Sequence, residues 1–133
     1  MRVFLVILLV LAGPLHAKVL SSEDLIGVWG SSEDQGKTFW GFDQYAANGK
    51  LISWGTLPDS ELSFELEGHY EVLSDQQSAI SCIVITRSSH PDMLAVGDEI
   101  CSLIVKLSAT ELHYVDTEGE YHVLYKQNLN QQI

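Results

Sequence analysis

Apolar and polar residues alternate strictly along residues 61–72. The even positions carry Leu, Phe, Leu, Gly, Tyr and Val, whereas the odd positions carry Glu, Ser, Glu, Glu, His and Glu. A two-residue period places one kind of side chain on each face of a strand, but a helix would spread both kinds over all its faces. A half-buried strand, or two such strands in series, is therefore predicted. The side chains expected to point inward are Leu62, Phe64, Leu66 and Tyr70.

Turn residues between strand-like runs predict two hairpins. Asn48-Gly49 separates the aromatic-rich run 37–46 from the run 50–54, and Asn-Gly accepts the positive φ angles of a type I′ turn. Asp-Thr-Glu-Gly at 116–119 separates the runs 111–115 and 121–126, and Gly119 suits a left-handed position. Each hairpin is expected to join two antiparallel strands.

The remaining strand-like runs are 25–29, 79–86 and 100–107, and beyond a turn at 21–24 no segment has a convincing helical period. About eight short strands at regular spacing predict an all-β fold, a small antiparallel up-and-down β-barrel, with a sandwich as the alternative. Residues 18–133 contain neither linker nor repeat and are expected to form a single domain.

Met1–Ala17 has the pattern of a cleaved signal peptide. An apolar run over 3–12 is followed by Gly13-Pro14 and by a small residue before the polar start at Lys18. The run is about half the ~20 apolar residues that a membrane anchor needs. We expect a secreted or periplasmic protein without membrane insertion.

Cys82 and Cys101 are the two cysteines of the chain. In an oxidising compartment, an even count without a C-x-x-C spacing favours one structural disulfide over metal or redox chemistry. Antiparallel pairing of the runs 79–86 and 100–107 would bring the two residues together.

Charge and motifs narrow the function classes. The net charge of −11, with no clustered Lys or Arg, argues against nucleic-acid binding. The chain contains no Gly-x-Ser-x-Gly, no His-Glu-x-x-His and no phosphate-binding glycine loop. We therefore assign no catalytic residues, no enzyme activity and no cofactor, and the oligomeric state stays open.

Leu25-Ile26-Gly27-Val28-Trp29 resembles the Gly-x-Trp signature that opens the first strand of lipocalins and the wider calycin group. Residues 42–50, Gly68-His69-Tyr70 and the closing run 121–126 extend the resemblance to short bacterial lipocalin-like domains over most of residues 18–133. The chain lacks the Thr-Asp-Tyr motif of full lipocalins and is shorter than they are.

The resemblance implies a lipocalin-like barrel with Trp29, two residues after Gly27, at its floor. It also implies a late cation over the tryptophan face, where Lys126 stands in place of the usual arginine and Arg87 is a second candidate. Such a cation–π contact is worth about 0.5 to 2 kcal/mol.

Aromatic residues in the first half of the barrel are the candidate ligand contacts. An eight-stranded barrel is just wide enough either to be packed by side chains or to hold one small ligand, so packing and pocket stay equal alternatives. If a pocket exists, its lining is expected to include Trp40, Trp54, Phe64 and Tyr70.

Histidines raise the question of metal binding. Glu67, His69 and Glu71 share one face of the predicted strand, but charged residues on an exposed face are the ordinary case, so no metal site is assigned. Whether His113 and His122 share a face depends on the register of the last hairpin.

Three functions remain. The first, which the resemblance implies, is binding of a small hydrophobic molecule in the barrel. The second is a protein-interaction module such as a periplasmic protease inhibitor. The third is a packed barrel without a ligand.

Overall fold

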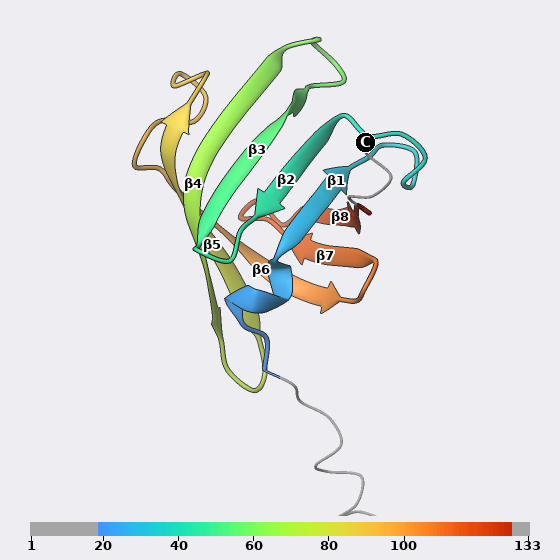
Figure 1. Cartoon of the computed structure of the whole chain (residues 1–133), viewed down its shortest axis with the longest axis vertical. Coiled ribbons are helices and arrows are strands. Elements are labelled where there is room, and N and C mark those ends of the chain that lie inside the picture. The colour runs from blue at the N-terminus through green and yellow to red at the C-terminus, as the bar shows by residue number, and fades with distance from the viewer. Residues whose placement is uncertain (1–18, 129–133) are drawn as a thin grey trace, which may run out of the picture.

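The computed structural model describes residues 19–128, so the predicted signal peptide, residues 1–17, lies outside the described residues. The sheet closes into a barrel because β1 pairs with β2 on one side and with β8 on the other, all antiparallel (Figure 1). The fold class predicted from the sequence, an eight-stranded up-and-down β-barrel, is confirmed, and the sandwich is excluded. The elements are the 3-10 helix η2 (Ser22–Leu25), β1 (Gly27–Ser31), β2 (Gly41–Tyr45), β3 (Lys50–Thr56), β4 (Ser63–Ser74), β5 (Ala79–Ser88), β6 (Glu99–Leu107), β7 (Glu111–Val115) and β8 (Tyr121–Lys126).

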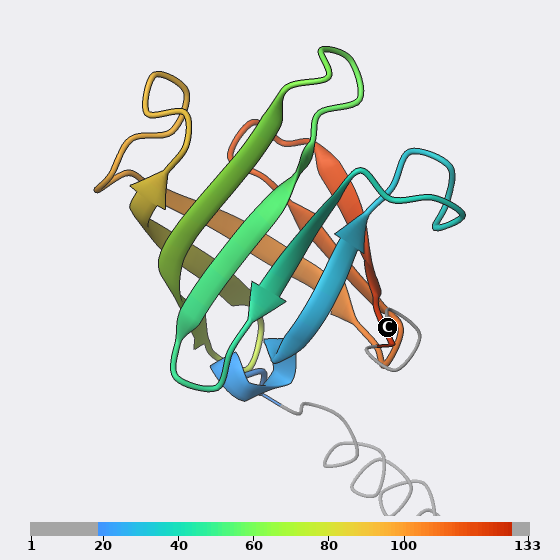
Figure 2. The ribbon, with the colours of Figure 1, turned by 45° about the horizontal axis from the view of Figure 1, so that its top comes forward.

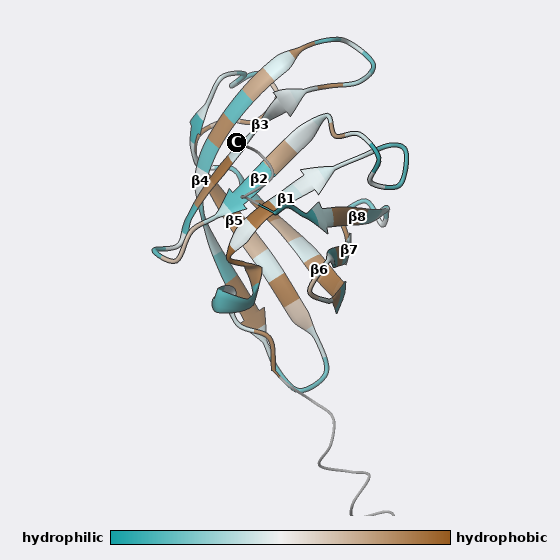
Figure 3. Cartoon of the chain, turned by 45° about the vertical axis from the view of Figure 1, so that its right-hand side comes forward, coloured by the Kyte–Doolittle hydropathy of each residue, from teal (hydrophilic) through white to brown (hydrophobic). Residues whose placement is uncertain are grey.

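Strand β4 follows the two-residue period of the sequence. Hydrophobic and hydrophilic residues form alternating bands along it (Figure 3). Phe64, Leu66 and Tyr70 lie opposite inward residues of the neighbouring strands. A bulge against β5 between Glu67 and Gly68 lets this strand of 12 residues curve around the barrel.

Both predicted hairpins are present, but the first turn differs in type. Ala46 N donates to Lys50 O at 2.9 Å and Gly49 N donates to Ala46 O at 3.1 Å. Gly49 has φ +87°, whereas Asn48 is not among the described residues with positive φ. This is a three-residue loop ending in a left-handed glycine, not the predicted type I′ turn, which needs two positive φ angles. The loop between β7 and β8 has the same pair of hydrogen bonds, from Asp116 N to Glu120 O and from Gly119 N to Asp116 O, and Gly119 has φ +84°.

Strand β2 begins at Gly41 rather than at the predicted position 37. The Asp34 carboxylate accepts hydrogen bonds from Thr38 N at 2.8 Å and Thr38 Oγ1 at 2.7 Å, and Ser32 Oγ accepts one from Gly36 N at 2.9 Å. Side chains thus take the backbone donors that a strand would use. The bonds from Thr38 lower the pKa of Asp34 to about 2.

The predicted disulfide is confirmed and lies on the outer surface of the barrel. Cys82 of β5 stands directly opposite Cys101 of β6, with 4.1 Å between their Cα atoms. Its neighbours Ser81 and Ile83 line the interior, so alternation along the strand turns Cys82 outward.

The two ends of the barrel differ in their connections. The β1–β2, β3–β4, β5–β6 and β7–β8 loops lie together at one end, which we call the mouth (Figure 2). Helix η2 and the three shorter turns lie at the other, closed end. No helix within residues 19–128 has the length and apolarity to cross a membrane.

Candidate functional site

An apolar pocket of about 190 Å³ opens at the mouth between the β3–β4 and β5–β6 loops. Its volume compares with engineered apolar cavities of about 150 Å³ that bind benzene. His90 is the one polar residue of the lining. The lining consists of Trp40, Leu57, Leu62, Phe64, Leu66, His90, Met93 and Leu94.

The inner wall of this mouth pocket comes from β4 and from the residue before β2. Phe64 reaches the pocket as an inward position of β4, and its ring meets Trp40 edge-on at a centroid distance of 6.3 Å. Trp40 is held through its backbone, which donates to Ser31 O at 3.0 Å and accepts from Thr56 N at 2.8 Å. A Cβ at Gly55 would lie 2.3 Å from Trp40 O, so only glycine permits this close approach.

The outer wall is a loop that hydrogen bonds hold against β4. Glu65 N donates to Ser89 Oγ and Ser89 N donates to Glu65 O, both at 2.9 Å. Met93 N and Leu94 N both donate to His90 O at 3.0 Å, which forms a tight turn that points apolar side chains at the pocket. Ser89 Oγ and His90 Nδ1 are 2.8 Å apart and hydrogen bonded.

The four residues predicted to line a ligand pocket do not share one site. Trp40 and Phe64 line the mouth pocket. Tyr70 lies toward the closed end, edge-on to Tyr45 at 4.8 Å, and its hydroxyl donates to Ala46 O at 2.6 Å. Trp54 lies on the outer face against Phe42, so its placement inside the barrel was wrong. Neighbouring residues of a strand point to opposite faces, and Ser53 points inward to Asp43, so Trp54 must point outward.

Trp29 fills the floor of the barrel and is 1% exposed. Its Nε1 donates to Leu25 O at 2.9 Å, and Lys126 Nζ lies 4.7 Å from the ring centroid while donating to Ile26 O at 2.7 Å. Of the two cations considered for this contact, Arg87 pairs instead with Glu67. Gly27 has φ +132°, and a Cβ there would meet Lys126 Nζ at 2.5 Å.

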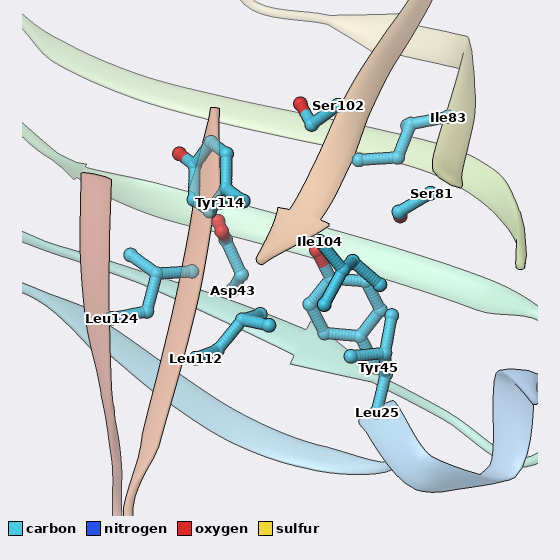
Figure 4. A pocket seen from close by; sticks show the side chains of 10 residues that line it. All are labelled: Leu25, Asp43, Tyr45, Ser81, Ile83, Ser102, Ile104, Leu112, Tyr114 and Leu124. Atoms are coloured by element: carbon cyan, nitrogen blue, oxygen red, sulfur yellow. The ribbon is translucent and has the colours of Figure 1, made fainter. Parts of the chain in front are cut away.

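A second cavity, of about 70 Å³, lies inside the barrel and shares no residue with the mouth pocket (Figure 4). Five of its lining residues are polar and five are aliphatic. The polar members are Asp43, Tyr45, Ser81, Ser102 and Tyr114; the aliphatic members are Leu25, Ile83, Ile104, Leu112 and Leu124.

Asp43 is the acidic group of this interior cavity. Its carboxylate accepts a hydrogen bond from Ser53 Oγ at 2.6 Å. Loss of hydration raises its pKa, because the charged form is disfavoured away from water, although the bond from Ser53 opposes the rise. Burial also raises the pKa of Tyr45 and of Tyr114, with a further contribution from Asp43 in each case.

The histidines of the last hairpin lie on opposite faces. His122 is paired with Tyr114, stacks on its ring at 4.9 Å and hydrogen bonds Asp116 at 2.7 Å. That hydrogen bond is the largest cause of the lowered pKa of Asp116. His113, one position earlier on β7, faces outward between Glu111 and Tyr121.

Three sets of candidate metal donors occur within residues 19–128: Glu67 with its neighbours, Asp116 with Glu120 and His122, and Cys82 with Glu99 and Cys101, whose sulfurs are joined in the disulfide. The carboxylate of Glu67 is occupied by Lys50 and Arg87, each at 3.2 Å, which lowers its pKa through Lys50 first. Asp116, Glu120 and His122 place donor atoms within 4.8 Å of one another. Asp116 also accepts backbone hydrogen bonds from Glu118 and Glu120, so its role in the turn accounts for its position.

Sequence reasoning missed the loop residues of the mouth pocket and the polar residues of the interior. Met93 and Leu94 are adjacent apolar residues in a largely polar loop, and this pattern in the sequence could have indicated that the loop covers an apolar pocket. Asp43 shares the parity of Tyr45, so an inward Tyr45 implies an inward Asp43.

No protein-family model matches this chain, and no curated protein matches it in sequence.

Proposed function

We propose that this chain is a secreted or periplasmic lipocalin-like binding protein that takes a small hydrophobic ligand in the mouth pocket. The observation that carries the proposal is the apolar lining of a pocket of about 190 Å³ at the mouth of the barrel. Ligand sites of proteins are typically apolar with a few polar groups that fix orientation.

Two features support the proposal of a lipocalin-like protein. The barrel is closed, with eight antiparallel strands in sequential order. Its floor carries a buried tryptophan under a lysine, the pair that the Gly27-x-Trp29 resemblance implies. The disulfide Cys82–Cys101 supports an oxidising compartment.

The chemistry of the lining defines the ligand class. Trp40 and Phe64 offer ring surfaces, and Leu57, Leu62 and Met93 offer aliphatic contacts. Two side chains of the lining carry hydrogen-bonding groups, the imidazole of His90 and the indole N–H of Trp40. The pocket therefore suits an uncharged ligand of a single ring or a short alkyl chain carrying one polar atom.

Tryptophan fluorescence tests this proposal, because the three tryptophans occupy different sites. Titration with toluene or hexanol should give a saturable change that persists in Trp54→Phe and disappears in Trp40→Phe. Leu62→Asp should abolish binding, whereas Leu103→Asp, on the outer surface where Leu103 is 43% exposed, is the matched control. A change that never saturates, or that is equal in both leucine variants, would contradict the proposal.

A protein-interaction module is the second candidate, and one observation favours it. Cross-strand pairing aligns outward apolar residues into a row across β4 to β8. Exposed rows of this kind on a barrel surface are typical of protein contacts. The row is Leu73, Ile80, Leu103, Val115 and Tyr121. If the row is an interface with a secreted protease, Leu103→Asp should abolish inhibition of that protease and leave hexanol binding unchanged.

A further inference from the structure

We propose that the interior cavity of the barrel binds a protonated primary amine, with Asp43 as its counter-ion. This goes beyond hydrophobic binding at the mouth, since the two pockets have no lining residue in common. It assigns a role to the five polar side chains that line an interior which small barrels usually fill by packing.

Among the described residues, Asp43 has no cation of its own. Within residues 19–128, Lys50 and Arg87 pair with Glu67, and His113 and His122 contact Glu111 and Asp116, so none of these side chains engages Asp43. Lys126 is turned to the face of Trp29 and to Ile26 O. A carboxylate removed from water without a partner charge is costly, so a cation that enters the cavity would offset that cost.

The cavity lining also supplies hydrogen-bond acceptors for an ammonium group. An ammonium group has three N–H donors, and the cavity offers the Asp43 carboxylate and the hydroxyls of Tyr45 and Tyr114. Ser81 is 8% exposed, and its Oγ is buried without a hydrogen-bond partner. Buried polar atoms in native proteins are nearly always paired, so an unpaired hydroxyl on the cavity wall indicates a missing polar occupant.

The size of the cavity and the apolar half of its lining limit which occupant fits. A cavity of about 70 Å³ holds a group a few water molecules in size, not a large ligand. Ile83, Ile104 and Leu112 present aliphatic contacts that suit the carbon of an amine. A Ca²⁺ or Mg²⁺ ion is disfavoured, because Ca²⁺ takes six to eight oxygen ligands and Mg²⁺ keeps several of its waters, whereas this small cavity offers a single carboxylate, that of Asp43.

Long-range charge acts in the same direction. The chain has a net charge of −11, so its field attracts cations and repels anions. An amine is therefore concentrated near the protein before it enters the barrel.

The test is calorimetric titration of the purified protein with methylammonium chloride at neutral pH. Sodium chloride and tetramethylammonium chloride at equal ionic strength are the controls, since neither carries an N–H donor. Saturable binding of methylammonium is expected, with no saturable heat from either control. Asp43→Asn keeps the shape of the side chain and removes the charge, and should weaken binding by at least about tenfold.

Tyr114→Phe provides a second variant if Asp43→Asn does not fold, and it should weaken methylammonium binding severalfold by removing one acceptor. Glu65→Gln, at an exposed position outside the cavity lining, should bind like the wild type. Equal heats from methylammonium and tetramethylammonium, or undiminished affinity in Asp43→Asn, would overturn the proposal. Hexanol binding at the mouth should persist in Asp43→Asn, so the two proposals can fail separately.

Discussion

The closed end and the mouth of this barrel are built on opposite principles. At the closed end, Trp29, Tyr70 and Lys126 each send their polar atoms to backbone carbonyls, and Trp29 is 1% exposed. At the mouth, Trp40 and Phe64 are only partly buried, and the pocket between them and the β5–β6 loop is apolar.

The difference separates stability from binding. Side chains whose polar atoms are satisfied and whose apolar surface is covered contribute most to the free energy of unfolding. Apolar side chains that keep accessible surface in a pocket contribute less to folding and retain surface for a ligand. Aromatic residues at the two ends should therefore respond differently to mutation.

The largest expected effect is at the floor. Trp29→Ala should lower the free energy of unfolding by about 3 to 5 kcal/mol, because it empties a fully packed site. Trp40→Ala, at the mouth, should cost less than half as much. Urea denaturation of both variants measures the contrast, and equal losses would remove the distinction between the two ends.

Removing the disulfide should lower the free energy of unfolding by nearly as much, although through the unfolded state and not through packing. The Cys82→Ser/Cys101→Ser variant should lose about 2 to 5 kcal/mol, mainly because the unfolded chain gains freedom. Hexanol affinity should change little, because neither cysteine lines the mouth pocket. Urea denaturation and hexanol titration of the same preparation check both statements. A loss of hexanol affinity together with stability would show that the shape of the mouth pocket depends on the strand pair β5–β6.

A smaller effect is expected from the cation over Trp29. Lys126→Met keeps much of the side-chain length but removes the charge, and should cost about 1 kcal/mol. Lys126→Arg should restore most of the loss, because guanidinium also stacks on indole. Equal stability of the Met and Arg variants would show that the aliphatic stem alone matters.

The smallest expected effect is a change in pH dependence within the interior cavity. The folded pKa of Asp43 is raised, so its protonated form is favoured in the native state, and the stability it contributes at low pH is lost as the pH rises through that pKa. Asp43→Asn should be most stabilising relative to wild type above that pKa and least so in acid. Tyr45 and Tyr114, the other titratable groups of the cavity lining, stay neutral throughout this range because their pKa values are raised. A stability difference that does not vary with pH would contradict the raised pKa.

Local pattern predicted much of the fold. Strands β7 and β8 begin and end where the sequence placed them, and β4 keeps its two-residue period. The strand β2 was predicted too long, because side chains of the preceding loop captured backbone donors. Of the four candidate pocket residues, Trp40 and Phe64 line the mouth pocket, whereas Trp54 and Tyr70 lie elsewhere.

The sequence alone determined which segments are strands, where the chain turns and which cysteines pair. Each of these depends on neighbours in the chain or on one pair of adjacent strands. Tertiary structure decided which face of β2 and β3 points inward, and so put Asp43 in the interior and Trp54 outside. The physical reason is that both faces of β2 and β3 mix apolar and polar residues, so these strands carry no clear parity signal of their own and only closure of the barrel selects the inner face.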